Sequence, residues 1–294
     1  MAFELIIVGG GHMGSALAEG LLGASWCLPE QLAVVESSVE QRASLQERLP
    51  GVTILAGLEL EHVGNDTGAV LCVKPNHAES AARVCGIAGV RRLLSVVAGL
   101  STARIEAVFP GPVAVIRSMP NTPVLVRKGV SAIAGGAHVT KDDLDWAESI
   151  LGAVGTVVRV TEQNIDAVSG LSGAMPAYLY LVVEALIEAG VHQGLSRDVS
   201  RQLVVGTFEG SASLLAVTGE SPEELRSQVT SPGGVTAAGL RMLEGLSLIH
   251  ISSRARRQGS AWQPTTTSTC SPTKVGLGQD RSGSILSLIH IRCV

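Results

Sequence analysis

The stretch that decides the fold is residues 5–14, Leu5-Ile6-Ile7-Val8-Gly9-Gly10-Gly11-His12-Met13-Gly14. Its four apolar residues predict a buried strand, and the glycines match G-x-G-x-x-G where a helix is expected to begin. Gly9 permits a tight turn, Gly11 lets a pyrophosphate approach the backbone, and Gly14 allows the helix to pack closely on the strand. His12 and Met13 complete the turn, with the phosphates expected at the helix N-terminus. The stretch predicts a dinucleotide-binding site.

The residues after the second expected strand bear on which dinucleotide is bound. Glu36 lies 22 residues past Gly14, where an acid binds the 2′-hydroxyl of the adenine ribose and repels a 2′-phosphate. Ser37 and Ser38 are able to bind such a phosphate, and Arg42 to pair with it, although both serines are equally expected as turn and cap residues. The cofactor is therefore NADP or NAD, with NAD favoured by charge.

From residue 1 to about 120, short apolar runs alternate with amphipathic segments. Runs of this kind are typical of strands buried on both faces of a parallel sheet that has helices on each side. The expected strands are residues 5–8, 32–35, 52–55, 69–73, 93–97 and 113–116. Residues 129–160 are expected to extend the sheet around a helix capped by Thr140 and Asp143. The alternation predicts an α/β fold, a doubly wound sheet of the Rossmann type, over residues 1–160.

Residues 161–245 predict one helix after another and thus an all-α second domain. Thr161, Ser196 and Ser221 are placed to cap helices. Residues 175–194 form a long and mostly apolar segment that so small a domain cannot easily bury. We therefore expect an oligomer interface.

Neither a membrane span nor a secretory leader is expected. The apolar stretch 179–191 is interrupted by Glu184 and Glu188, so we take it to be too short and too charged to cross a bilayer. The N-terminus lacks a basic region ahead of its apolar run. Five cysteines without a C-x-x-C pair favour reduced thiols. The protein is therefore expected in the cytoplasm.

Charge separates the last 49 residues from the rest. Residues 246–294 hold six of the 22 basic residues and one of the 26 acids, so the acidity lies in the first 245 residues. An acidic body with 3% aromatic residues argues against a nucleic-acid partner. The tail is rich in Ser and Thr and repeats one hexapeptide, residues 246–251, at 286–291. We expect residues 246–294 to be disordered and to be a non-native translated segment with no part in the fold.

Further motifs lie where the carboxyl ends of strands should meet. Val73-Lys74-Pro75 follows the fourth expected strand, at the edge where ligands of open α/β sheets bind, with a solvated turn lysine as the alternative. Ala98 follows the fifth strand and is counted with the cofactor residues. Met119-Pro120-Asn121-Thr122-Pro123 is a rigid polar loop, suited to nicotinamide or substrate, and otherwise a connecting turn.

Two small-residue loops are expected in the helical half. They are residues 170–178, which contain Ser172, and residues 230–236. Each is expected to present backbone N–H groups at a helix start, a seat for a small carboxylate, although simple helix caps explain them as well. Metal catalysis is not expected, because the seven histidines show no ligand spacing.

Taken in order, these motifs resemble pyrroline-5-carboxylate reductase over roughly residues 1–245. The most specific is Ser231-Pro232-Gly233-Gly234-Val235-Thr236. The resemblance implies a Rossmann domain, a helical dimerisation domain over 161–245, and reduction of 1-pyrroline-5-carboxylate to L-proline by NAD(P)H as a homodimer or higher oligomer. It implies that Thr236 binds the ring nitrogen, and that Ser231, Gly233 and Gly234 hold the substrate carboxylate, with Ser172 and Asn121 also near the substrate.

The chain departs from the family pattern at two places. Ala174 and Met175 stand where the family has small residues, and the resemblance ends near Gly245, which implies a second domain cut short. A β-hydroxyacid dehydrogenase relative is the alternative enzyme, but it needs a catalytic lysine in the helical half, and no lysine lies between Lys141 and Lys274. A truncated protein that binds cofactor without turnover is the alternative without activity.

Overall fold

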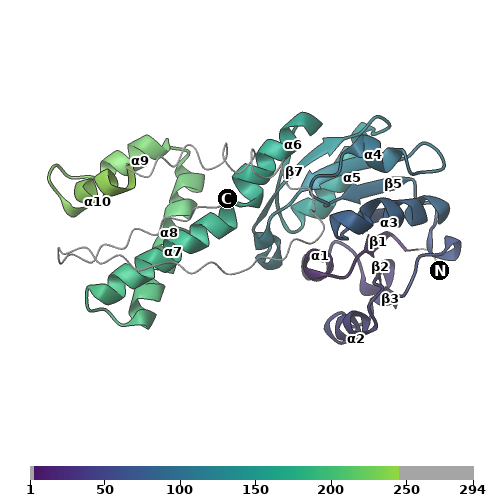
Figure 1. Ribbon diagram of the computed structural model, residues 1–294, viewed down its shortest axis with the longest axis horizontal. Coiled ribbons are helices and arrows are strands. Elements are labelled where there is room, and N and C mark those ends of the chain that lie inside the picture. Colours follow the sequence, from purple (N-terminus) through teal and green to yellow (C-terminus); the bar gives the residue numbers. More distant parts are fainter. Residues whose placement is uncertain (1–2, 245–294) are drawn as a thin grey trace, which may run out of the picture.

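The computed structural model describes residues 3–244 as a sheet domain followed by an extended set of helices (Figure 1). The sheet has the order β3-β2-β1-β4-β5-β6-β7-β8. Its strands are β1 (Leu5–Val8), β2 (Leu32–Val35), β3 (Thr53–Leu55), β4 (Gly68–Leu71), β5 (Arg92–Ser95), β6 (Ala114–Met119), β7 (Gly129–Gly135) and β8 (Gly155–Arg159). All neighbours are parallel except β6 and β7. The reversal of order between β1 and β4 confirms the doubly wound, Rossmann-type sheet.

Helices cover both faces of the sheet, and a further series of helices follows the last strand. They are α1 (His12–Gly23), α2 (Val39–Arg48), α3 (Pro75–Ile87), α4 (Thr102–Glu106), α5 (Lys141–Gly152), α6 (Glu162–Val168), α7 (Met175–His192), α8 (Arg197–Thr218), α9 (Pro222–Gln228) and α10 (Val235–Glu244). Three 3-10 turns are η1 (Pro29–Gln31), η2 (Leu60–His62) and η3 (Thr122–Val126). Thus the all-α second part is also confirmed.

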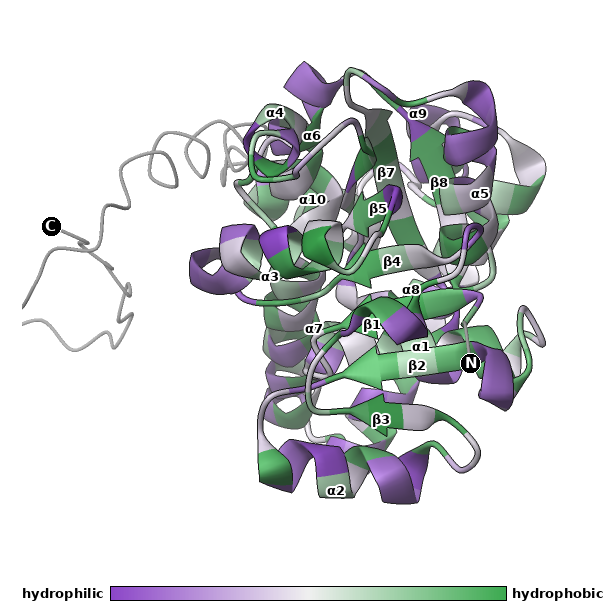
Figure 2. Cartoon of the chain, turned by 90° about the vertical axis from the view of Figure 1, so that its right-hand side faces the viewer, coloured by the Kyte–Doolittle hydropathy of each residue, from purple (hydrophilic) through white to green (hydrophobic). Residues whose placement is uncertain are grey.

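Alternation along each strand divides the core into two layers. Leu5 and Ile7 pack with α1 and α5 on one face, whereas Ile6 and Val8 pack with α3 and α4 on the other. All four side chains are buried, because helices cover the strand on both faces. This explains why the strand has an apolar residue at every position. The apolar strands at the centre of the sheet are visible as green arrows in Figure 2.

β4 and β5 end two residues earlier than the sequence predicts. The expected strands run to residues 73 and 97, whereas β4 ends at Leu71 and β5 at Ser95. The chain leaves the sheet there to form the connections to the next helices, so Val73 and Val97 belong to turns. This difference places Val73 at the ligand-binding edge.

The helix caps were largely predictable. Thr140 and Asp143 form the expected capping box on α5, and Ser196 and Ser221 accept hydrogen bonds from the first turns of α8 and α9. Thr161 stands at the N-cap of α6, but its side chain makes no capping hydrogen bond.

The expected loop at residues 170–178 is wrong. Residues Ser169–Gly173 form a π-helical turn, η4, that joins α6 to α7, and the helical run is unbroken over Glu162–His192. The N–H group of Ala174 binds the Ser169 carbonyl inside this run, so it is not a free donor. The small residues of this segment permit the wider π turn. Because no capping residue ends α6, the helical run continues through the turn into α7.

The continuous run also corrects the expectation that the apolar stretch is too short to cross a bilayer. Its 31 residues suffice by length and composition, and only 6% of its most apolar window is buried. The two glutamates, Glu184 and Glu188, do lie within it. The expected disordered tail, 246–294, lies outside the described residues.

Candidate functional site

The glycine turn between β1 and α1 is built as the sequence predicts. Gly9 has a φ of +107°, which favours glycine, and a Cβ there would lie 2.6 Å from the Cys72 carbonyl oxygen. A Cβ on Gly14 would lie 1.9 Å from the Gly9 carbonyl oxygen. These two glycines are required by the protein itself, because strand, turn and helix approach more closely than any side chain allows.

Gly11 is different, since nothing in the protein requires it. Its φ is −68°, and a Cβ there would meet no atom within 4 Å. It stands at the N-cap of α1, where free backbone N–H groups and the helix dipole attract anions. The open space at Gly11 fits the pyrophosphate of a dinucleotide. His12, which is exposed, and Met13 begin the helix beside it.

Glu36 joins the end of β2 to the glycine turn. Its Oε2 accepts the Gly10 N–H at 2.9 Å, and its Oε1 accepts the Ser38 N–H at 2.9 Å and the Ser37 hydroxyl at 3.3 Å. Gln41 donates from its side-chain amide to the Gly10 carbonyl at 2.7 Å, which also holds the turn. The carboxylate is thus fixed by donors from two segments.

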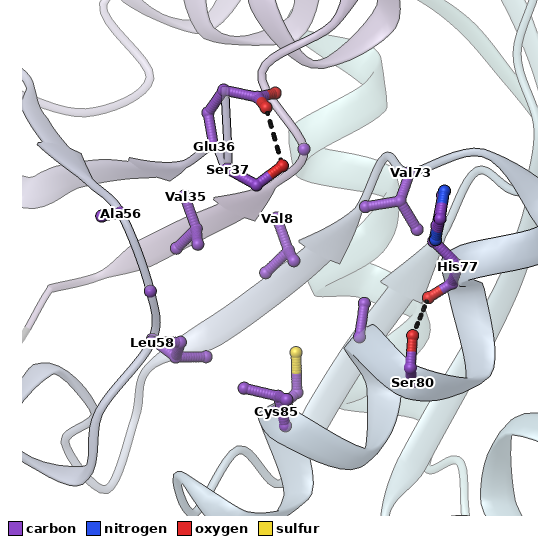
Figure 3. A pocket seen from close by; sticks show the side chains of 14 residues that line it. Val8, Val35, Glu36, Ser37, Ala56, Leu58, Val73, His77, Ser80 and Cys85 are labelled. Atoms are coloured by element: carbon purple, nitrogen blue, oxygen red, sulfur yellow. Dashed lines mark hydrogen bonds between the residues drawn. The ribbon is translucent and has the colours of Figure 1, made fainter. Parts of the chain in front are cut away.

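A cavity of about 310 Å³ opens beside Glu36 and Ser37 at the carboxyl ends of β1, β2 and β4 (Figure 3). This volume is in the range of small-molecule sites. Its walls are mainly apolar, which suits the flat adenine ring of a dinucleotide. The Glu36 carboxylate lies at one end of the cavity. Lining residues that sequence reasoning missed are Ala56, Gly57, Leu58, His77, Ser80, Ala81, Val84 and Cys85. They were missed because they share no motif and come from the β3 connection and α3.

The other predicted cofactor residues are distributed along the same sheet edge. Val73 lines the cavity, and Lys74 is the exposed N-cap of α3. Pro75 is the first residue of α3, a position that the fixed φ of proline favours. Ala98 is exposed in the turn after β5. Lys74 is therefore near the cavity without lining it.

The loop after β6 contacts the helical half through Asn121. The Asn121 Oδ1 accepts the Val130 N–H at 2.8 Å, and its Nδ2 donates to the Ser172 carbonyl at 3.3 Å. Pro120 is buried beside it, and Met119 packs near Gly173. The structure thus brings Asn121 and Ser172 together, with both ends of the amide engaged by the protein.

An ion pair fixes α6 to the sheet just below this contact. Arg117, on β6, is 5% exposed and donates to Asp166 at 2.6 Å, with Glu162 at 3.8 Å. Glu162 also accepts from the backbone N–H and the hydroxyl of Thr102. The cluster therefore ties α4, β6 and α6 together.

The second motif lies between α9 and α10. Gly233 has a φ of +71°, and the Gly234 N–H donates to the Ser231 carbonyl at 3.1 Å, so the turn ends at the start of α10. Thr236 is exposed in the first helical turn. This turn is suited to a small carboxylate, because the N–H groups of the first helical turn have no partner within the helix.

The two motifs lie far apart in one chain. The glycine turn is at the sheet end of the molecule, and α9 and α10 are at the opposite end (Figure 1). One chain thus presents a cofactor-type site and a carboxylate-type site that do not meet.

The thiols of Cys27, Cys72 and Cys85 are suited to packing. Burial raises the pKa of Cys85 to about 12 and that of Cys72 higher still. Burial, with a smaller contribution from Glu4, raises the pKa of Cys27 to about 11. All three are neutral thiols at physiological pH and therefore poor nucleophiles. Among residues 3–244, no group of three His, Cys, Asp or Glu side chains is arranged to hold a metal ion.

Comparison with known proteins gives matches to both halves. Residues 162–260 match the family model for pyrroline-5-carboxylate reductase dimerisation, which runs past residue 245, where the resemblance was expected to end. Residues 4–99 match the model "NADP oxidoreductase coenzyme F420-dependent".

Relatives that match most of the chain are named pyrroline-5-carboxylate reductase. The chain is 40% identical to a pyrroline-5-carboxylate reductase of Corynebacterium melassecola over 82% of this chain and 90% of that one. It is 39% identical to one from Synechocystis over 83% and 91%. The solved structure of a Plasmodium falciparum pyrroline carboxylate reductase with NADP bound superposes with a TM-score of 0.76, at 30% identity over 87% of this chain and 95% of that one.

Proposed function

We infer that this chain, which belongs to the pyrroline-5-carboxylate reductase family, reduces 1-pyrroline-5-carboxylate to L-proline, the last step of proline biosynthesis. The cofactor is NADPH or NADH, which supplies a hydride to the carbon of the protonated C=N bond. The observation that carries the inference is that one chain of this family has both the open space at Gly11, suited to a pyrophosphate, and the turn at 231–236, suited to a small carboxylate.

The chain's own residues divide the work of binding. Gly9, Gly11 and Gly14 shape the pyrophosphate seat, and Glu36 holds the adenine ribose. Val73, Lys74, Pro75, Ala98 and Pro120 line the path of the cofactor toward the nicotinamide end. Holding two rings in contact is the main requirement, since hydride transfer needs little more than orientation.

The turn at 231–236 binds the substrate. The Ser231 hydroxyl and the Gly233 N–H hold the carboxylate, which the dipole of α10 favours. Gly234, whose N–H donates to the Ser231 carbonyl, closes the turn around it. The hydroxyl of Thr236 hydrogen-bonds the ring nitrogen and fixes the face that the C=N carbon presents to the cofactor. Asn121 supports this arrangement by holding Ser172 and the loop after β6 in register.

The active site is assembled from two chains. Because α10 and the glycine turn lie at opposite ends of one chain, the turn at 231–236 reaches a cofactor only when it belongs to another copy (Figure 1). The match of residues 162–260 to a dimerisation model supports a homo-oligomer. The exposed apolar face of α7 then becomes the surface on which copies associate. A homo-oligomer in the cytoplasm, without nucleic acid or membrane, completes the proposal.

Mixed dimers test this arrangement. Gly11→Val fills the pyrophosphate seat and Thr236→Val removes the hydroxyl, so each variant alone is expected to lack activity. Co-expressed in equal amounts, they should recover about a quarter of wild-type activity, because half of the randomly formed dimers then contain one intact site. No recovery above the separate variants would place both motifs of a site in one chain, and an active Thr236→Val would remove the role given to Thr236.

The alternatives are separated by the same assay. The dehydrogenase alternative lacks its lysine, since none occurs in residues 161–244. A protein that binds NADH but forms no proline from 1-pyrroline-5-carboxylate would be the non-catalytic alternative.

A further inference from the structure

The hydrogen bonds around Glu36 decide a question that the residue pattern leaves open. A 2′-phosphate needs donors at the end of β2, and the sequence offers Ser37, Ser38 and Arg42. In the structure, the Ser37 hydroxyl and the Ser38 N–H both donate to Glu36 Oε1. The carboxylate thus occupies the two donors that a phosphate would use.

Arg42 is also engaged. Its Nη1 donates to the Glu36 carbonyl at 2.9 Å and to the Ser37 carbonyl at 2.8 Å. The guanidinium is thereby held against the backbone of the β2–α2 turn. It supports the turn that presents Glu36, and its Nη1 is not free for a phosphate.

Charge acts in the same direction. Glu36 lines the cavity beside Val35 and Ser37, where the adenine ribose is expected (Figure 3). A phosphate there brings about −1.5 to −2 charges next to a fixed carboxylate. A ribose with both hydroxyls free instead donates to that carboxylate.

We propose that Glu36 makes this chain select NADH over NADPH. The proposal rests on the proposed function, since it concerns the cofactor of that reaction. Glu36 acts in two ways, by accepting the ribose hydroxyls of NADH and by keeping Ser37 and Ser38 from a 2′-phosphate. Removing the carboxylate takes away the repulsion, so that the positive charge of Arg42, held in the same turn, then attracts a 2′-phosphate.

Direct binding tests the proposal without turnover. NADH and NADPH are titrated separately into the full-length protein, with nicotinamide fluorescence as the readout. NADH should bind at least about tenfold more tightly than NADPH, a difference of about 1.4 kcal/mol. Because no substrate is present, a failed reductase activity does not affect the result, and the two proposals stand or fall separately.

Variants assign the preference to residues. Glu36→Gln should weaken NADH binding and strengthen NADPH binding, so that the ratio of the two Kd values changes by about tenfold or more. The double variant Glu36→Gln with Arg42→Ala should lose the gained NADPH affinity. Glu47 is an exposed carboxylate on α2, away from the cavity, so Glu47→Gln removes the same charge and should leave both Kd values unchanged.

The outcomes are distinct. Equal or tighter binding of NADPH by the wild-type protein overturns the proposal. So does a Kd ratio that Glu36→Gln and Glu47→Gln shift equally, because net charge alone would then explain it. Circular dichroism of each variant shows whether it is folded, and Glu36→Asp, which keeps the charge, should retain the preference for NADH.

Discussion

The sheet domain and the helical half bury their apolar residues to very different extents. Leu5, Ile6 and Ile7 on β1 are completely buried, whereas Tyr180 and Leu181 on α7 are 64% and 67% exposed. Both segments are apolar in sequence, so hydropathy alone does not distinguish them. The difference teaches that the sheet domain completes its own core, whereas the helical half leaves apolar side chains exposed, as the proposed association of chains requires.

The largest expected effect comes from a charge on the exposed face of α7. Leu181→Glu should prevent association and abolish reductase activity, because an unpaired carboxylate buried between chains costs several kcal/mol and about 1.4 kcal/mol is a tenfold change in affinity. Light scattering after size-exclusion chromatography measures the mass.

The matched control lies in the sheet domain. Ile87, the last residue of α3, is 71% exposed, so Ile87→Glu adds the same charge to an equally exposed apolar residue. It should leave mass and activity unchanged. If both variants remain oligomeric, α7 is not the surface on which the chains associate.

Within the sheet domain, two glycines should separate folding from binding. Gly14→Ala places a Cβ against the Gly9 carbonyl and should lower the free energy of unfolding by about 3 kcal/mol. Gly11→Ala meets no protein atom, so it should keep the wild-type Tm and weaken NADH binding by about tenfold. Thermal denaturation and NADH titration on both variants distinguish these effects. A Gly11→Ala protein that binds NADH normally would show that the open space is not the pyrophosphate seat.

The joint between the two halves should give a smaller effect. Asp166→Ala leaves the buried Arg117 with only Glu162 at 3.8 Å and should cost about 2 kcal/mol, less than a fully buried pair because Asp166 is itself largely exposed. Arg117 Nε already lacks a hydrogen-bond partner, so the site has no spare acceptor. Chemical denaturation measures the loss, with the exposed Glu47→Gln as control. No change in stability would mean that the pair contributes nothing to the joint.

The smallest effect is a dependence of stability on alkaline pH. The Cys27 pKa is raised to about 11, whereas an unfolded thiol ionises near about 8.5. The stability that this neutral thiol contributes is fully present below the unfolded pKa and is lost as the pH rises toward the folded pKa, by at most about 1.4 kcal/mol per pH unit. Cys27→Ala should therefore give a flatter decline of stability between about pH 9 and 10.5. Parallel curves at one protein concentration would contradict this.

The sheet domain was largely predictable because its signals are local. A strand buried on both faces is apolar at every position. Gly9 and Gly14 are required by their close approach to Cys72 and to each other within one tight turn, which the glycine pattern predicts. The caps at Thr140 and Ser221 are equally local. The fold of the first half therefore follows from short windows of sequence.

The parts that sequence reasoning missed depend on distant contacts. Leu58 and His77 line the same cavity only because the connection after β3 and the helix α3 come together at the sheet edge. Asn121 is expected to face a ligand, yet its amide joins Val130 and Ser172, which are 9 and 51 residues away. The small residues near Ser172 suggest a loop, but they form a π turn within a continuous helix. Such outcomes depend on packing that no local pattern encodes.

A small tilt at the base of the unbroken helical run from Glu162 to His192 becomes a large displacement at its far end. At about 1.5 Å per residue its 31 residues extend about 46 Å, so a tilt of about 5° at the base moves the far end by about 4 Å. The base is held by Arg117 and Asp166. If the site is shared between chains, the ion pairs of Arg117 on β6 and the contact between Asn121 and Ser172 help to set how accurately one chain delivers its Thr236 to the nicotinamide of another.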